Sequence, residues 1–99
     1  MIIVLFDLIK KGRKMPNVEI YSSNTCPYCV RAKQLLDSKG VDYVEYNISN
    51  DMDARTKMME RTNGARSVPQ IFINDDHYGG CDDLYALEAE GKLDIILAG

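Results

Sequence analysis

The sequence predicts a single α/β domain in which helices cover both faces of a small mixed sheet. Its 99 residues suit one hydrophobic core and no more. A hydrophobic fraction of 45% and a charged fraction of 27% are typical of a globular chain rather than a disordered one. Strand-like and helix-like segments follow in the order βαβα–ββα. This order implies a parallel pair of strands joined by a helix, followed by an antiparallel hairpin, and so a four-stranded sheet.

The first half of the chain predicts a strand, a helix and a second strand. Residues 18–21 alternate in polarity, and residues 22–25 supply turn and helix-capping side chains. A helix is expected from Pro27, because proline is tolerated in a first turn, to a stop near Gly40. Residues 41–48 predict the second strand. The apolar residues that share one face of it are Val44, Tyr46 and Ile48.

A second helix and a hairpin are expected next. Asn50 or Asp51 is expected to cap a helix that stops near Gly64. Residues 71–73 form a continuous apolar run, which is typical of a buried central strand. Residues 74–76 have the side chains of a hairpin turn, so the chain is expected to return as a short antiparallel strand.

The last part of the chain predicts that short strand and a broken helical region. The strand is expected at His77 and Tyr78. Asp82 or Asp83 is expected to cap the helical region that follows, because aspartate is a favoured capping residue. The region is interrupted at Gly91 and resumes with inward-facing apolar residues.

The first 14 residues differ in composition from the rest of the chain. They hold four of the 12 basic residues and one of the 15 acidic ones. The apolar run 1–6 is too short to span a membrane, and basic residues follow it instead of preceding it as in a signal peptide. We therefore expect a cytoplasmic protein with no membrane partner. Residues 1–14 are expected to extend a domain of residues 15–99, either upstream of a native start at Met15 or as an amphipathic anchor.

Charge and cysteine content exclude two broad classes of protein. The net charge of −3 argues against a nucleic-acid binder, which needs a basic face to displace counterions from phosphates. Three cysteines are too few for a disulfide-stapled secreted scaffold, and an odd number leaves at least one of them unpaired. A disulfide in this chain is therefore expected to be reactive rather than structural.

Two of the cysteines form the motif Cys26-Pro27-Tyr28-Cys29, at the predicted junction of a strand and a helix. A thiol at a helix N-terminus is stabilised as the thiolate by the unpaired N–H groups there. Cys26 is thus the predicted nucleophile, and Cys29, one turn later, is placed to attack a mixed disulfide formed at Cys26. Tyr28 is expected either to pack locally or to shape the edge of the thiol site.

The main alternative for such a pair of cysteines is that they supply two of the four ligands of a zinc site. The chain offers only His77 and Cys81 as further ligands of the usual kind, and both belong to a late hairpin. The strand, motif and helix context favours thiol–disulfide exchange instead. No metal is expected.

Three short segments carry the more specific pattern. They are residues 25–29 (Thr-Cys-Pro-Tyr-Cys), residues 67–73 (Ser-Val-Pro-Gln-Ile-Phe-Ile) and residues 79–84 (Gly-Gly-Cys-Asp-Asp-Leu). Together they resemble the small bacterial dithiol glutaredoxins over nearly all of residues 15–99. The resemblance implies the thioredoxin fold, with a four-stranded mixed sheet and helices on both faces.

The resemblance also implies a glutathione site. The bond before Pro69 is expected to be cis, so that the backbone of Val68 faces the thiols. The helix that opens at Cys81, Asp82 and Asp83 is expected to hold the γ-glutamyl group, while the Cys81 thiol itself is a bystander. The residues expected to bind glutathione are Tyr28, Arg66, Ser67, Val68, Pro69, Gly80, Cys81, Asp82 and Asp83.

One position departs from the family pattern. Ser23 stands where relatives commonly place a lysine that contacts the glycine carboxylate of glutathione. Arg66 is expected to bind that carboxylate instead, assisted by Gln70, although a solvated loop charge is an equally good interpretation of Arg66. His77, the only histidine, is expected to be a hairpin residue rather than a general base.

The resemblance implies an enzyme that reduces protein–glutathione mixed disulfides and protein disulfides through Cys26 and Cys29, with glutathione as reductant. The expected partners are glutathione, glutathionylated proteins and disulfide-containing proteins such as ribonucleotide reductase, and the protein is expected to be a monomer. Two alternatives stay open. One is a thioredoxin-like protein served by its own reductase, although the chain lacks tryptophan. The other is a glutathione-ligated iron–sulfur protein, against which Pro27 and Cys29 argue.

Overall fold

The computed structural model describes residues 16–98, whose four strands form one mixed sheet in the order β2-β1-β3-β4. The central strand β1 pairs in parallel with β2 and antiparallel with β3, and β3 pairs antiparallel with β4. The strands are β1 (Val18–Ser22), β2 (Tyr43–Asn47), β3 (Gln70–Ile73) and β4 (Asp76–Gly79). The predicted α/β class, the mixed four-stranded sheet and the order of elements along the chain are therefore confirmed. The predicted second strand, 41–48, is shorter than expected.

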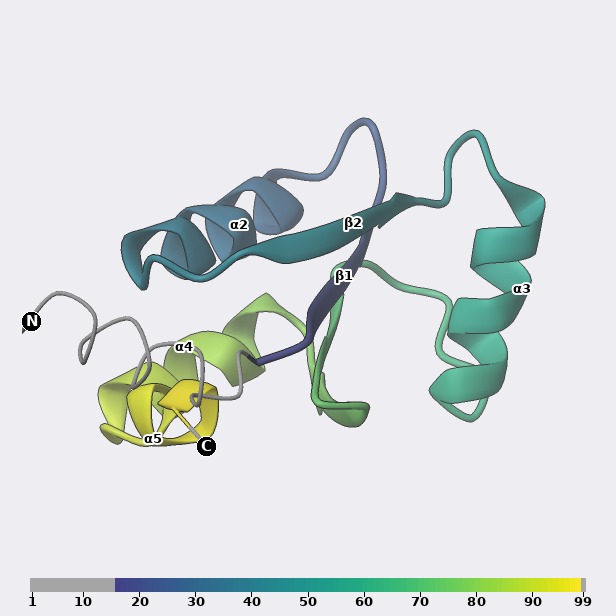
Figure 1. Ribbon diagram of the computed structural model, residues 1–99. Helices are drawn as coiled ribbons and strands as arrows, with labels where there is room; N and C mark the ends of the chain where they lie inside the picture. Colours follow the sequence, from purple (N-terminus) through teal and green to yellow (C-terminus); the bar gives the residue numbers. More distant parts are fainter. Residues whose placement is uncertain (1–15, 99) are drawn as a thin grey trace, which may run out of the picture.

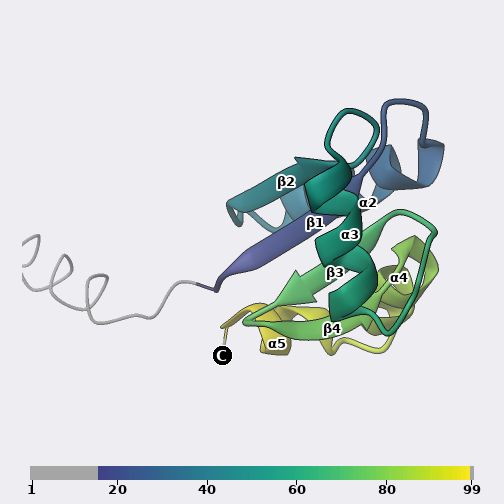
Figure 2. The same ribbon diagram turned by 90° about the vertical axis from the view of Figure 1, so that its right-hand side faces the viewer.

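Helices cover both faces of this sheet (Figure 1). On one face lie α2 (Pro27–Ser38), α4 (Cys81–Ala89) and α5 (Leu93–Ala98), and on the other lies α3 (Met52–Arg61). Figure 2 turns α3 toward the viewer and shows it lying across the sheet, opposite α2 and α4. Within residues 16–98, no helix is long and apolar enough to cross a membrane.

The two faces have separate cores. Buried aliphatic side chains of β1 and β3 pack against α2, α4 and α5, with Ile20, Leu36 and Leu84 fully buried among them. The α3 face is smaller and more aromatic. Its buried members are Tyr21, Ile48, Ala54, Met58 and Phe72.

Strand β1 is buried along its whole length, which the alternation of its sequence did not predict. Because helices cover both faces of this central strand, Glu19 is only 9% exposed. Its carboxylate accepts hydrogen bonds from the Arg61 guanidinium on α3 at 3.0 and 3.2 Å, and from the Tyr46 hydroxyl at 3.2 Å. The buried charge is thus paired, as buried carboxylates require.

Local signals fixed most of the boundaries. Asp51 caps α3, where its side chain accepts from the Ala54 N–H at 3.1 Å. Asn74 and Asp75 both adopt positive φ, as the tight turn of a hairpin requires. The expected cap of α4 was wrong, because its N-cap is Gly80 and both Asp82 and Asp83 lie inside the first turn.

Residues 1–15 and 99 lie outside the described part of the chain. The hypotheses of an extension over residues 1–14 and of a start at Met15 fall there and remain predictions.

Candidate functional site

Cys26 occupies the N-cap position of α2, directly before Pro27 in the first turn. The backbone N–H of Cys29 donates a hydrogen bond to Cys26 Sγ at 3.1 Å, and the first turn holds no acidic residue. This N–H and the positive end of the helix dipole both stabilise a thiolate at this position.

Cys29 lies one turn deeper and is 1% exposed. The Cα atoms of Cys26 and Cys29 are 5.2 Å apart, and the two residues form a disulfide. Cys26 is the more accessible of the pair.

The loop that leads into Cys26 is tied to the end of β2. The Asn24 N–H donates to Ser49 Oγ at 3.0 Å, and Asn47 Nδ2 donates to Asn24 Oδ1 at 2.6 Å. The Ile48 N–H donates to the Ser22 carbonyl at 2.8 Å. These bonds hold the start of α2 against the sheet, so Cys26 is presented from a fixed loop.

The Val68–Pro69 peptide bond is cis, as the resemblance implied. The carbonyl oxygen of Val68 lies 3.7 Å from Cys26 Sγ, although the two residues are 42 positions apart in the sequence. The backbone before Pro69 therefore forms one wall beside the thiols.

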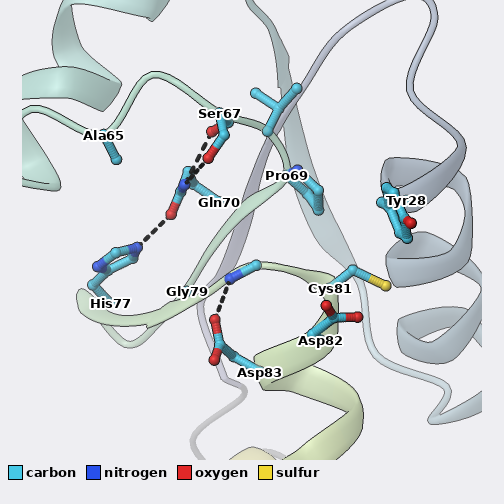
Figure 3. Close-up of a pocket in the computed structure, with 12 residues that line it drawn as sticks. Tyr28, Ala65, Ser67, Pro69, Gln70, His77, Gly79, Cys81, Asp82 and Asp83 are labelled. Carbon is cyan, nitrogen blue, oxygen red and sulfur yellow. Dashed lines mark hydrogen bonds between the residues drawn. The ribbon is translucent and has the colours of Figure 1, made fainter.

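A pocket of about 410 Å³ opens next to this wall (Figure 3). Three parts of the chain meet there: the first turn of α2, the loop before β3, and the N-terminus of α4 together with β4. Eight of the nine predicted glutathione-binding residues line it, and Arg66 does not. The lining residues are Tyr28, Ala65, Ser67, Val68, Pro69, Gln70, His77, Gly79, Gly80, Cys81, Asp82 and Asp83.

The N-terminus of α4 supplies backbone donors to this pocket. The first N–H to be bonded within the helix is that of Leu84, to the Gly80 carbonyl at 3.1 Å, so the preceding N–H groups have no partner in the helix. Asp83 accepts from the Gly80 N–H at 2.9 Å. Gly79 adopts a φ of 95°, and a Cβ there would overlap the Asp83 carboxylate. The glycine thus permits the close turn into α4.

Cys81 is buried, with 4% of its surface exposed. Burial raises the pKa of its thiol above the usual value, with Arg31 acting in the opposite direction. A thiol of raised pKa is less ionised at neutral pH and a weaker nucleophile. This environment agrees with the expectation that the Cys81 thiol is a bystander.

Tyr28 and Arg66 are both exposed. Tyr28, which is 55% exposed, stands on the edge of the pocket on the α2 side (Figure 3). The predicted contact of Arg66 with glutathione stays a prediction.

Four lining residues lie outside the predicted glutathione-binding set: Ala65, Gln70, His77 and Gly79. Gln70 was expected only to assist Arg66, and His77 only to be a hairpin residue. Gln70 is 6% exposed, and its side chain bonds to both Ser67 and His77. Only the position of Gln70 directly after Pro69 was a signal, since a polar side chain at the start of a buried strand needs partners. Within residues 16–98, no three histidine, cysteine or acidic side chains are grouped to hold a metal ion.

A sequence model of glutaredoxin matches residues 18–78 of the chain. Glutaredoxin 3 of Escherichia coli is 57% identical over 83 residues, which is 84% of this chain and 99% of that protein. The chain belongs to the glutaredoxin family. Members of this family are glutathione-dependent thiol–disulfide oxidoreductases, and this glutaredoxin carries the Cys26–Cys29 pair of the dithiol type.

Solved glutaredoxin structures share its fold. The glutaredoxin of Brucella melitensis is 51% identical, with a TM-score of 0.73 over 85% of this chain and 90% of that one. A buckwheat glutaredoxin–glutathione complex is 28% identical, with a TM-score of 0.74 over 94% of this chain and 89% of that one. The resemblance to glutaredoxins and the thioredoxin fold expected from it are confirmed.

Proposed function

We propose that this glutaredoxin reduces protein–glutathione mixed disulfides with Cys26 as nucleophile. The Cys26 thiolate attacks the glutathionyl sulfur, the bond to the protein sulfur breaks, and the protein leaves as a thiolate that takes up a proton. A second glutathione thiolate then attacks the glutathionyl sulfur held on Cys26. Oxidised glutathione departs and the Cys26 thiolate returns, so electrons and atoms balance.

Protein disulfides require both cysteines. The Cys26 thiolate attacks one sulfur of the substrate, and the resulting mixed disulfide is then attacked by Cys29. The reduced substrate leaves and the Cys26–Cys29 disulfide remains, which two glutathiones reduce. The observation that carries this scheme is the N-cap geometry, where the Cys29 N–H bonds Cys26 Sγ at 3.1 Å while Cys29 itself stays buried.

We place glutathione in the 410 Å³ pocket, supported by its position beside Cys26 and by the buckwheat complex. The backbone of Val68 would pair with the cysteinyl part of glutathione, as an added strand pairs with a sheet edge. The free N–H groups at the start of α4 would receive the γ-glutamyl carboxylate. Asp82, exposed on the pocket rim, would take the γ-glutamyl ammonium.

The remaining parts of the proposal concern partners and organisation. Glutathionylated and disulfide-containing proteins are the proposed substrates, with ribonucleotide reductase one candidate. We also propose a cytoplasmic monomer whose domain spans residues 15–99. The family match over residues 18–78 supports that boundary.

Two serine variants test the roles of the thiols. Cys26→Ser should abolish turnover of both a glutathionylated peptide and a protein disulfide, because no other accessible thiolate stands at the site. Cys29→Ser should keep the first activity and lose the second. Both are measured with glutathione and glutathione reductase as the coupled system.

Cys81→Ser is the matched control and should keep both activities within about twofold, since its thiol takes no part in the scheme. Turnover by Cys26→Ser would refute the assigned nucleophile. Activity that requires a thioredoxin reductase instead of glutathione would favour the thioredoxin-like alternative.

The carboxylate contact of glutathione is tested separately. Arg66→Glu should raise KM for a glutathionylated peptide more than Ser23→Ala does, because it places a negative charge beside the proposed glycine carboxylate. Equal and small effects of the two changes would remove Arg66 from the site.

A further inference from the structure

Hydrogen bonds link the Gln70 side chain to the loop before Pro69 and to His77 on β4. Gln70 Nε2 donates to the Ser67 carbonyl oxygen at 2.9 Å, and Gln70 Oε1 lies 2.6 Å from His77 Nε2 (Figure 3). Gln70 is 6% exposed, so its amide cannot exchange these partners for bulk water.

The chemistry of the partners fixes the direction of these hydrogen bonds. The Ser67 carbonyl can only accept, so the amide NH₂ of Gln70 must face it and Oε1 must face His77. His77 Nε2 must therefore carry a proton and donate. Both ends of the Gln70 amide thus have partners within the protein. Its NH₂ group donates to the Ser67 carbonyl and, at 3.4 Å, to Ser67 Oγ, and its Oε1 accepts from His77.

The imidazole of His77 is itself held in place. It stacks on the Phe72 ring, with centroids 4.9 Å apart and planes at 28°. The register pairs Phe72 with His77, which brings His77 diagonally opposite Gln70 on the same face of the sheet. The Arg61 guanidinium lies 3.8 Å from the centroid of the Phe72 ring. The donor to Gln70 thus rests on packed aromatic groups although His77 stands on an exposed edge strand.

The anchored carbonyl belongs to the peptide that joins Ser67 to Val68. In a trans peptide the C=O and N–H point in opposite directions, so a Ser67 carbonyl held toward Gln70 turns the Val68 N–H away from it. Within residues 16–98, no hydrogen bond uses this N–H. Gln70 therefore sets the orientation of an unpaired donor in the loop whose next carbonyl lies 3.7 Å from Cys26 Sγ.

We propose that Gln70, oriented by His77, is a positioning residue that aims the Val68 N–H at the cysteinyl backbone of bound glutathione. The proposal rests on the glutathione site proposed above and adds what holds that site in shape. Neither residue touches the reacting sulfur atoms, so the thiolate chemistry of Cys26 does not depend on them.

Gln70→Met removes the hydrogen bonds to Ser67 and His77 while nearly keeping the volume of the side chain. We expect KM for a glutathionylated peptide to rise roughly threefold to tenfold, the loss typical of one hydrogen bond, with kcat within about twofold. The rate of Cys26 alkylation by iodoacetamide as a function of pH should be unchanged. The amide resonance of Val68 in a ¹H–¹⁵N spectrum should shift.

His77→Phe keeps the stack on Phe72 and removes only the donor to Gln70. Its KM should rise less than that of Gln70→Met, and the double variant should be no worse than Gln70→Met alone, because the two changes act through one set of hydrogen bonds. Tyr46→Phe is the matched control. It removes a hydrogen bond on the same face of the sheet, to Glu19, and should leave KM unchanged.

Two outcomes would overturn the proposal: a KM within twofold of the parent for Gln70→Met, or an effect confined to kcat. If Gln70→Met does not fold, His77→Phe tests the proposal instead. A KM of His77→Phe equal to that of the unchanged protein would also contradict the proposal. The activity of the unchanged protein separates a failure of the proposed function from a failure of the positioning role. If the unchanged protein does not turn over the glutathionylated peptide, the proposed function fails, whereas parent turnover with unaffected variants removes the positioning role alone.

Discussion

The three cysteines of this chain lie in different surroundings, which is the physical reason to expect that they differ in reactivity. Cys26 receives a backbone N–H at a helix N-cap, Cys29 is buried behind it, and Cys81 is buried at the start of another helix. Cys81 also stands in a first turn, yet burial raises the pKa of its thiol. Position at a helix start is therefore not sufficient, since a reactive thiolate also needs access and a donor aimed at the sulfur.

Replacing Gly79 should affect both the stability of the fold, through backbone strain, and the binding of substrate, through the position of Asp83. Gly79→Ala places a Cβ in the space of the Asp83 carboxylate and at a φ of 95°. We expect a loss of about 2–3 kcal/mol in the free energy of unfolding, of which about 1 kcal/mol is backbone strain. Because Asp83 must move away from the α4 N-cap, KM for a glutathionylated peptide should also rise.

Gly40→Ala is the matched control for this change. Gly40 also has a positive φ, of 69°, but open space surrounds the added Cβ. It should lose only the strain part of about 1 kcal/mol in urea unfolding and keep its KM. Equal losses for the two variants would show that Asp83 adapts freely.

At the scale of elements, the order of strands and helices followed from local patterns. Polarity alternation, capping residues and the Asn74-Asp75 turn each acted within a few residues, and together they predicted the correct order of elements and the Asp51 cap of α3. The cap of α4 was misplaced because aspartates are favoured both at an N-cap and inside a first turn. Local sequence does not distinguish the two when Gly80 precedes them.

The buried polar partners of the sheet were beyond the reach of local patterns. Glu19 resembles the outward residue of an alternating strand, but its partner Arg61 is 42 positions away. The same limit applied to Gln70 and His77, whose bond depends on the diagonal placement of two strands. Such pairs become visible only once the elements are packed.

Arg61 joins α3 to the sheet through both charge and ring contacts. It pairs with Glu19 and lies over Phe72, with a side chain 20% exposed. Arg61→Met should retain contact with the ring but leave a buried carboxylate without its cation. We expect a loss of about 2–3 kcal/mol at pH 7, near the low end for a broken buried pair. Urea unfolding measures it.

A second change tests whether the unpaired carboxylate causes this loss. Adding Glu19→Gln should recover part of the loss at pH 7. Lys57→Met, on the exposed side of α3, is the control and should cost less than about 0.5 kcal/mol. If Glu19→Gln recovers none of the loss, Arg61 acts through packing alone.

At the scale of the whole molecule, the sheet brings together three sites that the sequence separates. The start of α2, the loop before β3 and the start of α4 meet at one pocket, because β1 and β3 are adjacent and α2 packs beside α4. The resemblance to glutaredoxins, which these three motifs carry, implied which segments meet. The supports behind them, including the Asn24 loop contacts and the Gln70 amide, required the packed structure.

The boundary of the folding unit is the last testable consequence of this arrangement. Among residues 16–98, the buried members of both cores lie between Val18 and Leu97. Asn17 closes the start of β1 against the hairpin: its N–H donates to Asn74 Oδ1 at 2.9 Å, and its carbonyl accepts from the Asn74 N–H at 2.8 Å. A chain that begins at Met15 keeps all of these contacts, whereas one that begins at Glu19 loses Asn17 and the buried Val18.

We therefore expect the chain 15–99 to unfold in urea within about 0.5 kcal/mol of the full protein and to keep its kcat and KM, because it keeps every core and pocket residue that the structure describes. The chain 19–99 should lose at least about 2 kcal/mol, since it gives up a buried valine and the paired hydrogen bonds of Asn17. Sedimentation should show the same oligomeric state for the full protein and the chain 15–99. A loss above about 1 kcal/mol in the chain 15–99, or a change in its oligomeric state, would place part of the folding unit before Met15.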